Sequence, residues 1–341
     1  MNLLLSLIIA GSGGYLATLL GIPLPWMLGS LFASICWNLT SQRFATIPHG
    51  RRIAQYTIGV SLGLYFTPTA IALIYNNIGL LFSGVFFCLF VSLIIIYFNA
   101  RNESSFATIY FTYLPGGASE MTNLSKHYHG DNTYIAIGHT TRIILLVFCV
   151  PFLVKLFIPP HETTLQEVVT DQFDLFSLLL LFISSSIGVY IWRFLKQPNP
   201  WMLGALLGVG IITYFNNYNF KIPSIYLSIA QILLAMALAE PITRSSLKTS
   251  LAALPRMFIS SFISIVILFI TSYLLSHYFH IEFLTIALGI MPGGISEMSL
   301  TALQLNLDVP IVSTLQTTRL IMVMLTAKPI YHLMRHFLVR T

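Results

Sequence analysis

Two copies of one short motif place an ionisable side chain directly after a break in the backbone. Pro115-Gly116-Gly117-Ala118-Ser119-Glu120-Met121 recurs 177 residues later as Pro292-Gly293-Gly294-Ile295-Ser296-Glu297-Met298. Proline cannot continue the hydrogen-bond ladder of a helix, and a glycine pair tolerates backbone conformations that other residues resist. Serine is a good N-cap, and an acid suits the first turn of a helix. The motif therefore predicts a helix that ends, breaks and restarts.

An arginine follows the glutamate of each motif by 22 residues. Arg142 and Arg319 each end a Thr-Thr-Arg sequence inside an apolar segment. A charge at the centre of a membrane-spanning helix costs about 2.5–3.5 kcal/mol on insertion scales, and such residues usually belong to functional sites. We expect each Glu–Arg pair to meet across the site, so that the two costs partly offset. A pair that only holds helices together is the alternative.

The elements that position these residues must lie in a membrane. Hydrophobic residues make up 56% of the 341-residue chain and charged residues only 8%, whereas soluble domains carry about 25% charged residues. The net charge is +6, but the Lys and Arg residues stand singly or in small groups between apolar blocks. That pattern is typical of loops that set membrane orientation, so the expected partner is the lipid bilayer and not nucleic acid.

Further matches indicate that the whole chain is a tandem duplication. Pro25-Trp26-Met27-Leu28-Gly29 returns 175 residues later as Pro200-Trp201-Met202-Leu203-Gly204, and Gly13-x-Tyr15 returns as Gly188-x-Tyr190. We predict a first membrane repeat over residues 1–157, an acidic linker over 158–174 and a second membrane repeat over 175–341. Each repeat has six apolar segments, at about 3–20, 24–40, 52–67, 77–98, 105–128 and 132–155, and at about 176–193, 200–215, 224–240, 255–276, 282–306 and 309–330.

Loop charges predict that the two repeats face opposite ways. If the Pro-Gly-Gly segment enters and leaves on one side, 13 basic residues lie on the cytoplasmic side and two outside, as the positive-inside rule favours. The cytoplasmic residues are then Arg43, Arg51, Arg52, Arg101, Lys126, Arg193, Lys196, Arg244, Lys248, Arg256, Lys328, Arg335 and Arg340, and the outer ones are Lys155 and Lys221. Six crossings per repeat would divide the same residues nine to six.

The expected fold is therefore an all-α polytopic membrane protein with two inverted repeats. Each repeat has about five transmembrane helices plus a Pro-Gly-Gly segment that is re-entrant or broken. Each arm of that segment spans about 18 Å of helix, just over half of a hydrocarbon core of about 30 Å. Both alternatives remain open. Both termini are predicted to be cytoplasmic, with the linker on the periplasmic side of the inner membrane.

Other polar residues of the apolar segments could take part in the same site. Gln55 and Gln231 match each other, and His139 stands where the second copy has Gln316. These four are candidate accessory residues, with packing as the alternative. The histidine pairs lack an accompanying acid or cysteine cluster, and the three cysteines are interpreted as packing residues, so we expect no metal and no cofactor. Tryptophan in Pro-Trp-Met-Leu-Gly is interpreted as an interfacial anchor.

The pair of Pro-Trp-Met-Leu-Gly and Pro-Gly-Gly-x-Ser-Glu-Met motifs resembles the membrane AbrB family of Gram-negative bacteria over nearly the whole chain. Members are often labelled ammonia monooxygenases or regulators of gene expression. The resemblance implies an inner-membrane protein. A monooxygenase needs copper or iron held by several His, Asp, Glu or Cys ligands, and the intramembrane set here is too small.

The motifs together predict a secondary transporter for a small anionic solute rather than an enzyme. Paired breaks with half-helix N-termini near the membrane midplane are typical of such transporters, and helix N-termini and arginines both favour an anion. The glutamates could carry a coupling H⁺ or help to bind Na⁺. A membrane sensor that affects gene expression indirectly is the alternative, and a homodimer is compatible with either. The predicted substrate site consists of Pro115, Gly116, Gly117, Ser119, Glu120, Arg142, Pro292, Gly293, Gly294, Ser296, Glu297 and Arg319.

Overall fold

The computed structural model describes residues 3–40, 45–100, 105–157, 175–216, 222–250 and 252–338. The described residues of the first copy form α1 (Leu3–Leu19), α2 (Pro25–Leu39), α3 (Gly50–Gly63), α4 (Pro68–Asn76), α5 (Ile78–Ala100), α6 (Phe106–Tyr113), α7 (Ala118–Ser125), the 3-10 helix η1 (Lys126–Tyr128) and α8 (Asn132–Phe157). Those of the second form α9 (Leu175–Phe194), α10 (Pro200–Asn216), α11 (Ser224–Ala239), α12 (Arg244–Ser250), α13 (Leu254–Phe279), α14 (Phe283–Ile290), α15 (Ile295–Gln304) and α16 (Val309–Leu338).

The helices repeat in order, so α1 to α8 correspond one by one to α9 to α16. The described part of the chain is all-α, as expected, and ten of the twelve predicted segments match a single helix within a few residues, α16 alone running further, to Leu338. The other two are the interrupted segments, which form α6 with α7 and α14 with α15. The sequence did not predict the short helices α4 and α12. The acidic linker at 158–174 lies outside the described residues.

Five described helices are long and apolar enough to cross a membrane, and the bent pair of α3 and α4 is a sixth candidate. The two members of that pair meet at 89°. Apolar side chains also point away from the protein interior. Phe82, Phe86 and Phe90 follow one face of α5 at four-residue spacing and are 57%, 60% and 51% exposed. Because a water-soluble surface rarely carries such a stripe, the chain is a multi-pass membrane protein whose long helices face lipid.

The helices gather into two compact units that do not follow the boundary between the copies. Unit 1 comprises residues 1–76, 149–240 and 299–310, and unit 2 comprises residues 77–148, 241–298 and 311–341. The first three helices of both copies therefore share unit 1. Both helix breaks, with α6, α7 and α14, belong to unit 2, whereas α15 divides between the units after Met298. The division of the sequence into repeats stays a prediction about the chain, because neither repeat forms a compact body by itself.

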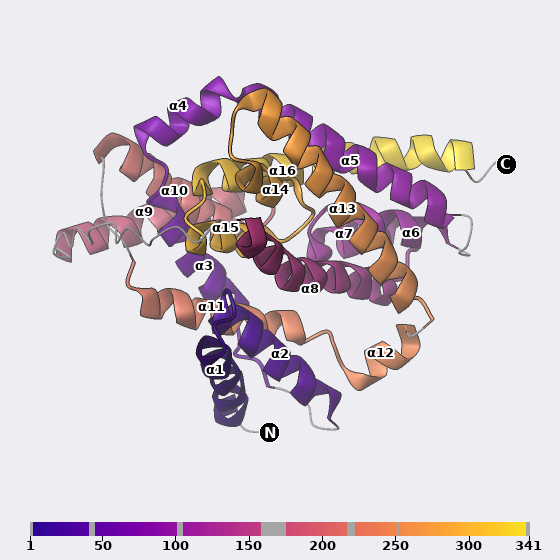
Figure 1. Cartoon of the computed structure of the whole chain (residues 1–341), viewed down its shortest axis with the longest axis horizontal. Coiled ribbons are helices and arrows are strands. Elements are labelled where there is room, and N and C mark those ends of the chain that lie inside the picture. The colour runs from indigo at the N-terminus through magenta and orange to yellow at the C-terminus, as the bar shows by residue number, and fades with distance from the viewer. Residues whose placement is uncertain are drawn as a thin grey trace. The chain divides into compact units, whose positions relative to one another are not determined.

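In unit 1 the two copies interlock. Helix α1 packs on α2, as α9 packs on α10, and α2 and α10 each contact the third helix of the other copy, α11 and α3 respectively (Figure 1). The repeated glycines explain the close approach of the first two helices. A Cβ atom on Gly13 or Gly29 would collide with backbone of the other, and Gly188 and Gly204 stand in the same relation. These matches therefore encode helix packing through small residues, which supports a structural role for the Pro-Trp-Met-Leu-Gly motif.

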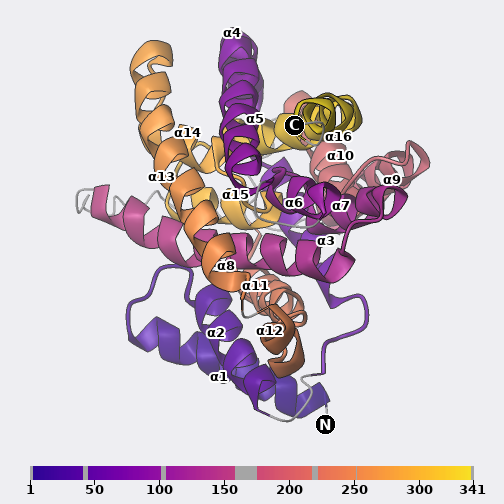
Figure 2. The same ribbon diagram turned by 90° about the vertical axis from the view of Figure 1, so that its right-hand side faces the viewer.

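In unit 2 the long helices α5 and α13 pack against each other and carry the interrupted helices (Figures 1 and 2). Helix α6 packs on α5, and α14 packs on both α13 and α5. Polar contacts hold the pair of long helices at one end, where Asn99 Nδ2 donates to Ser260 Oγ at 3.1 Å. A glycine admits the second interrupted helix, since a Cβ atom on Gly84 would meet Ile290 and Leu315. Unit 2 thus builds the framework around both breaks.

Candidate binding site at the paired helix breaks

Both breaks have the conformation that the motif predicts. Helix α6 ends at Tyr113 and α14 ends at Ile290, and the next residues, Leu114 and Met291, are extended at φ −64°, ψ 136° and φ −62°, ψ 138°. The Gly116 amide donates to the Leu114 carbonyl at 2.9 Å, and the Gly293 amide donates to the Met291 carbonyl at 2.8 Å. Each break is thus a tight three-residue turn centred on a proline, whose fixed φ suits that position.

The glycines are required for space and not for unusual backbone angles. Gly21 is the one glycine with positive φ among the described residues. A Cβ atom on Gly116 or Gly293 would instead collide with the side chain of Met121 or Met298, and both methionines are fully buried. The expectation that the pair supplies backbone freedom is therefore wrong. The first glycine of each motif makes room for the methionine that ends it.

The second glycine of each motif makes room for the glutamate. A Cβ atom on Gly117 would collide with the carboxylate of Glu120, and one on Gly294 with that of Glu297. Gly117 is the N-cap of α7, at φ −73° and ψ 143°, and Glu120 is the third residue of that helix. The predicted serine N-cap is wrong, because the helix starts two residues earlier than the serine would require. Ser119 and Ser296 take the second helical position, and the Ser119 side chain lies outside the described residues.

The two glutamates thus fold back over the first turns of α7 and α15. Glu297 is 3% exposed, whereas Glu120 is half-buried. A carboxylate at this position faces the unpaired amides of the helix N-terminus, which carry about half a positive charge. Each glutamate therefore offsets the positive end of its own half-helix.

The two arginines cap the half-helices on the other side of the breaks. Arg142 Nη1 donates to the carbonyls of Leu114 and Tyr113 at 3.4 and 3.5 Å. Arg319 Nη1 donates to the Met291 carbonyl at 2.5 Å, and its Nη2 donates to the Gly293 carbonyl at 2.9 Å. A helix C-terminus carries about half a negative charge, which a cation stabilises. Within the described residues Arg142 makes these contacts and forms no ion pair with Glu120, so the expected pair is not seen in the first copy.

His139 and Gln316 are equivalent residues that support the same caps. His139 Nε2 pairs with the Phe111 carbonyl at 2.9 Å, and Arg142 Nη2 contacts His139 Nδ1 at 2.8 Å. Arginine only donates, so Nδ1 accepts and Nε2 carries the proton given to Phe111. Gln316 Nε2 donates to the carbonyls of Leu288 and Met291 at 2.6 and 3.0 Å. Leu288 is the counterpart of Phe111, so both residues donate to equivalent carbonyls, but among the described residues only His139 also contacts its arginine, because Gln316 Oε1 has no hydrogen-bond partner there.

The arginines converge on Cys88 of α5, which is fully buried. The Cys88 thiol is hydrogen-bonded to the Arg319 side chain and lies within electrostatic range of Arg142, and the two guanidinium groups also lie within range of each other. Arg142 and Arg319 are 6% and 3% exposed, and the Nε atom of each has no hydrogen-bond partner among the described residues. The interpretation of Cys88 as a plain packing residue missed this contact, because no motif links it to the arginines.

The remaining predicted residues divide between the two units. Pro115 and Pro292 are buried in unit 2 with the rest of the motifs. Gln55 and Gln231 belong to unit 1, where Gln55 is half-buried and Gln231 is 1% exposed. The site of unit 2 thus contains His139 and Gln316 but neither Gln55 nor Gln231.

Comparison with known proteins gives one family and two relatives. The model of the family described as "Transition state regulatory protein AbrB" matches residues 26–335. The chain is 25% identical to "Uncharacterized protein YhjN" of Bacillus subtilis (strain 168), over 96% of this chain and 92% of the relative. It is 23% identical to "Putative regulator AbrB" of Escherichia coli (strain K12), over 63% of this chain and 62% of the relative. No solved structure matches the chain significantly. The Bacillus relative shows that such proteins are not confined to Gram-negative bacteria.

Proposed function

The chain belongs to the membrane AbrB family, and we propose that it is a secondary transporter for a small anionic solute. The solute binds in unit 2, between the paired helix breaks and beside Arg142 and Arg319. The site binds and releases its ligand without covalent chemistry. The cell inner membrane is the proposed location, with both termini in the cytoplasm.

The observation that carries this proposal is the pair of buried arginines around one uncharged thiol. Each guanidinium group offsets the C-terminus of a half-helix, but that end supplies only about half a negative charge. Each arginine also keeps an unpartnered Nε–H donor, and a buried donor without a partner costs about 1–3 kcal/mol. A small anion between the two arginines would balance the remaining charge and accept from both donors. Guanidinium groups suit carboxylates and other oxyanions because they bind them in a bidentate manner.

The repeat architecture supports movement of the bound anion. Two helix breaks from corresponding positions of two copies lie in one unit, and many secondary transporters build a central site from such paired breaks. The loop charges favour inverted copies with five crossings each. In such an arrangement one break faces each side of the membrane, so a single site opens alternately to either side.

The glutamates offer a coupling step within the same proposal. With Glu120 and Glu297 ionised, their carboxylates occupy the positive N-termini of α7 and α15, where an anion would otherwise bind. A proton or Na⁺ taken up with the solute neutralises that competing charge. An H⁺ or Na⁺ gradient could thereby drive anion uptake.

A membrane sensor is the second candidate, and the names of the matched family and of the Escherichia coli relative favour it. A sensor would bind the same anion at the same arginines without moving it. Loss of the solute from the medium, or its binding, would then act on gene expression through another protein. Flux across a membrane separates the two candidates.

The first experiment is a screen of the purified protein for stabilisation by small anions, with pH and Na⁺ varied. Acetate, succinate, citrate, phosphate and sulfate are the probes, each as the same counter-ion salt. We expect one class to raise the unfolding temperature of the wild type. Arg142→Lys and Arg319→Lys keep the charge but remove the Nε donor, so the anion-dependent rise should shrink in both. Arg244→Gln changes an exposed arginine of α12 and should respond as the wild type does. Equal responses in all four proteins would contradict the site.

A further inference from the structure

Trp201, the tryptophan of the second Pro-Trp-Met-Leu-Gly motif, is flanked by two arginines from different helices of unit 1. The guanidinium carbon of Arg52, on α3, lies 5.9 Å from the centre of the Trp201 ring, and that of Arg193, on α9, lies 5.7 Å from it. Both arginines are exposed. Cation–π contacts at this distance hold the two like charges near one ring.

Arg193 and Trp201 line a cavity of about 530 Å³ with an aromatic rim, and Arg52 contacts this cavity only through the Trp201 ring. Its walls are formed by Tyr56, Ser186, Val189, Tyr190, Arg193, Phe194 and Trp201. None of these lining residues is acidic, so the positive charge of the cavity is not neutralised by its own walls. Tyr190 and Phe194 are 73% and 77% exposed. Exposed Trp, Tyr and Phe beside arginines are typical of the zone where a membrane meets water.

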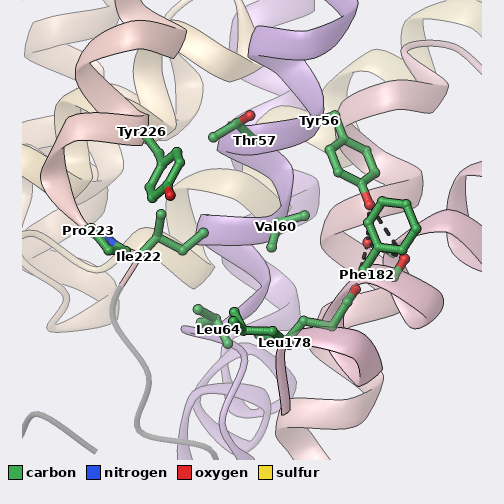
Figure 3. A pocket seen from close by; sticks show the side chains of 11 residues that line it. Tyr56, Thr57, Val60, Leu64, Leu178, Phe182, Ile222, Pro223 and Tyr226 are labelled. Carbon is green, nitrogen blue, oxygen red and sulfur yellow. Dashed lines mark hydrogen bonds between the residues drawn. The ribbon is translucent and has the colours of Figure 1, made fainter. Parts of the chain in front are cut away.

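A second cavity, of about 430 Å³, begins at the same tyrosine and is largely apolar (Figure 3). Tyr56 lines both cavities, and its hydroxyl contacts Ser185 Oγ at 2.5 Å and Ser186 Oγ at 3.4 Å. The second cavity continues between α3, α9 and α11, past Val60 to Leu64 and Leu178. A basic aromatic end thus adjoins an apolar channel in one unit.

The length of this groove matches one leaflet of a membrane. Leu178 at the apolar end and Arg193 at the basic end lie on the same helix, about 22 Å apart at about 1.5 Å per residue. Half of a bilayer with its head groups measures about 20–22 Å. A lipid with its head group at Arg193 would therefore place its acyl chain along the apolar cavity.

We propose that unit 1 binds an anionic phospholipid in this groove. The phosphate lies at Arg52, Arg193 and Trp201, and one acyl chain fills the cavity beneath Tyr56. The uncompensated pair of arginines selects a head group with net negative charge. The apolar cavity selects a lipid over a free anion, which would leave that cavity empty. The predicted orientation places both arginines at the cytoplasmic face, whose leaflet is rich in anionic lipid.

The test compares lipid binding to the detergent-purified full chain by native mass spectrometry. The probes are long-chain phosphatidylglycerol, phosphatidylcholine with the same chains, and inorganic phosphate. We expect the wild type to retain phosphatidylglycerol over phosphatidylcholine. Removing one arginine near an anionic membrane surface should weaken binding about fivefold, and removing both about thirtyfold. Arg52→Gln and the double variant Arg52→Gln/Arg193→Gln measure these losses.

Arg51→Gln is the matched control, because Arg51 is also exposed but lies about 100° around α3 from Arg52. An equal loss in this control would show general surface charge and overturn the site. Equal retention of the two lipids would do the same, and so would displacement of phosphatidylglycerol by inorganic phosphate. Val60→Phe fills the apolar cavity and should weaken long-chain but not short-chain phosphatidylglycerol. Unchanged long-chain binding in that variant, at unchanged thermal stability, would contradict the proposed place of the acyl chain.

Discussion

His139 and Gln316 stand at equivalent positions and each donates to an equivalent carbonyl, that of Phe111 or Leu288, so the second copy shows that glutamine fits this position. In His139→Gln, the amide can donate to the Phe111 carbonyl and its oxygen can accept from Arg142, as the two imidazole nitrogens do now. In His139→Leu, a side chain of similar size makes neither bond. The glutamine variant should therefore keep the cap, and the leucine variant should lose it.

The expected difference follows from the two bonds. A hydrogen bond to a charged group contributes about 1.5–3 kcal/mol and a neutral one about 1 kcal/mol. His139 is fully buried, so water cannot replace either bond. Allowing for relaxation, His139→Leu should destabilise the protein by about 2–4 kcal/mol, and His139→Gln by less than about 1 kcal/mol.

Thermal unfolding in one detergent, with activity or ligand response as a second readout, measures this difference. At about 2 °C per kcal/mol for a large domain, His139→Leu should lower the unfolding midpoint by about 4–8 °C. His127→Leu, at an exposed histidine of η1, is the control and should change the midpoint little. If His139→Gln lowers the midpoint as far as His139→Leu does, the claim that glutamine can replace histidine in this cap is refuted.

Three other predictions concern packing, the glutamate and topology. Gly188→Ala should destabilise the protein by about 1–3 kcal/mol, since its Cβ atom would collide with backbone of α10. Gly11 has open space around it, so Gly11→Ala should stabilise α1 by up to about 1 kcal/mol. Thermal unfolding measures whether each variant raises or lowers the midpoint. Gly117→Ala should displace the Glu120 carboxylate, so that in a double-mutant cycle Gly117→Ala and Glu120→Ala are not additive, and additive losses would sink this interpretation. A single cysteine at Thr163 of the linker, with the native cysteines replaced by serine, should react with an impermeant reagent added outside intact cells; labelling only after lysis would refute the inverted arrangement.

Much of the fold could be predicted from the sequence, because the length of an apolar segment indicates whether it can form a membrane-spanning helix. The segment at 77–98 became α5, and the Pro-Gly-Gly break in 105–128 became the turn between α6 and α7. The helices α4 and α12 were missed because each is much shorter than a membrane span. The grouping of equivalent helices into shared units could not be predicted, because it depends on contacts between copies that one sequence does not record.

The residue types and their recurrence in both copies predicted which residues form the site. They did not predict the atoms with which these residues form hydrogen bonds. Glu120 and Arg142 recur with their counterparts at a constant spacing, which indicated a pair. The structure instead gives each charge to a different end of a half-helix. A sequence does not show which backbone carbonyls and amides lack a hydrogen-bond partner. A charged residue that caps a broken helix therefore cannot be told from one that forms an ion pair. Cys88 belongs to the site only through its tertiary contact with the arginines, which no sequence motif indicates.

The central claim is that the anion bound at Arg142 and Arg319 is moved across the membrane. The most direct measurement is counterflow of the anion identified by the stability screen, in liposomes that contain the purified protein. We expect counterflow in the wild type and in Arg244→Gln, and its loss in Arg142→Lys and Arg319→Lys at a temperature at which all four proteins remain folded. Binding without counterflow in the wild type would contradict transport and favour the sensor. Undiminished counterflow in both lysine variants would contradict the site.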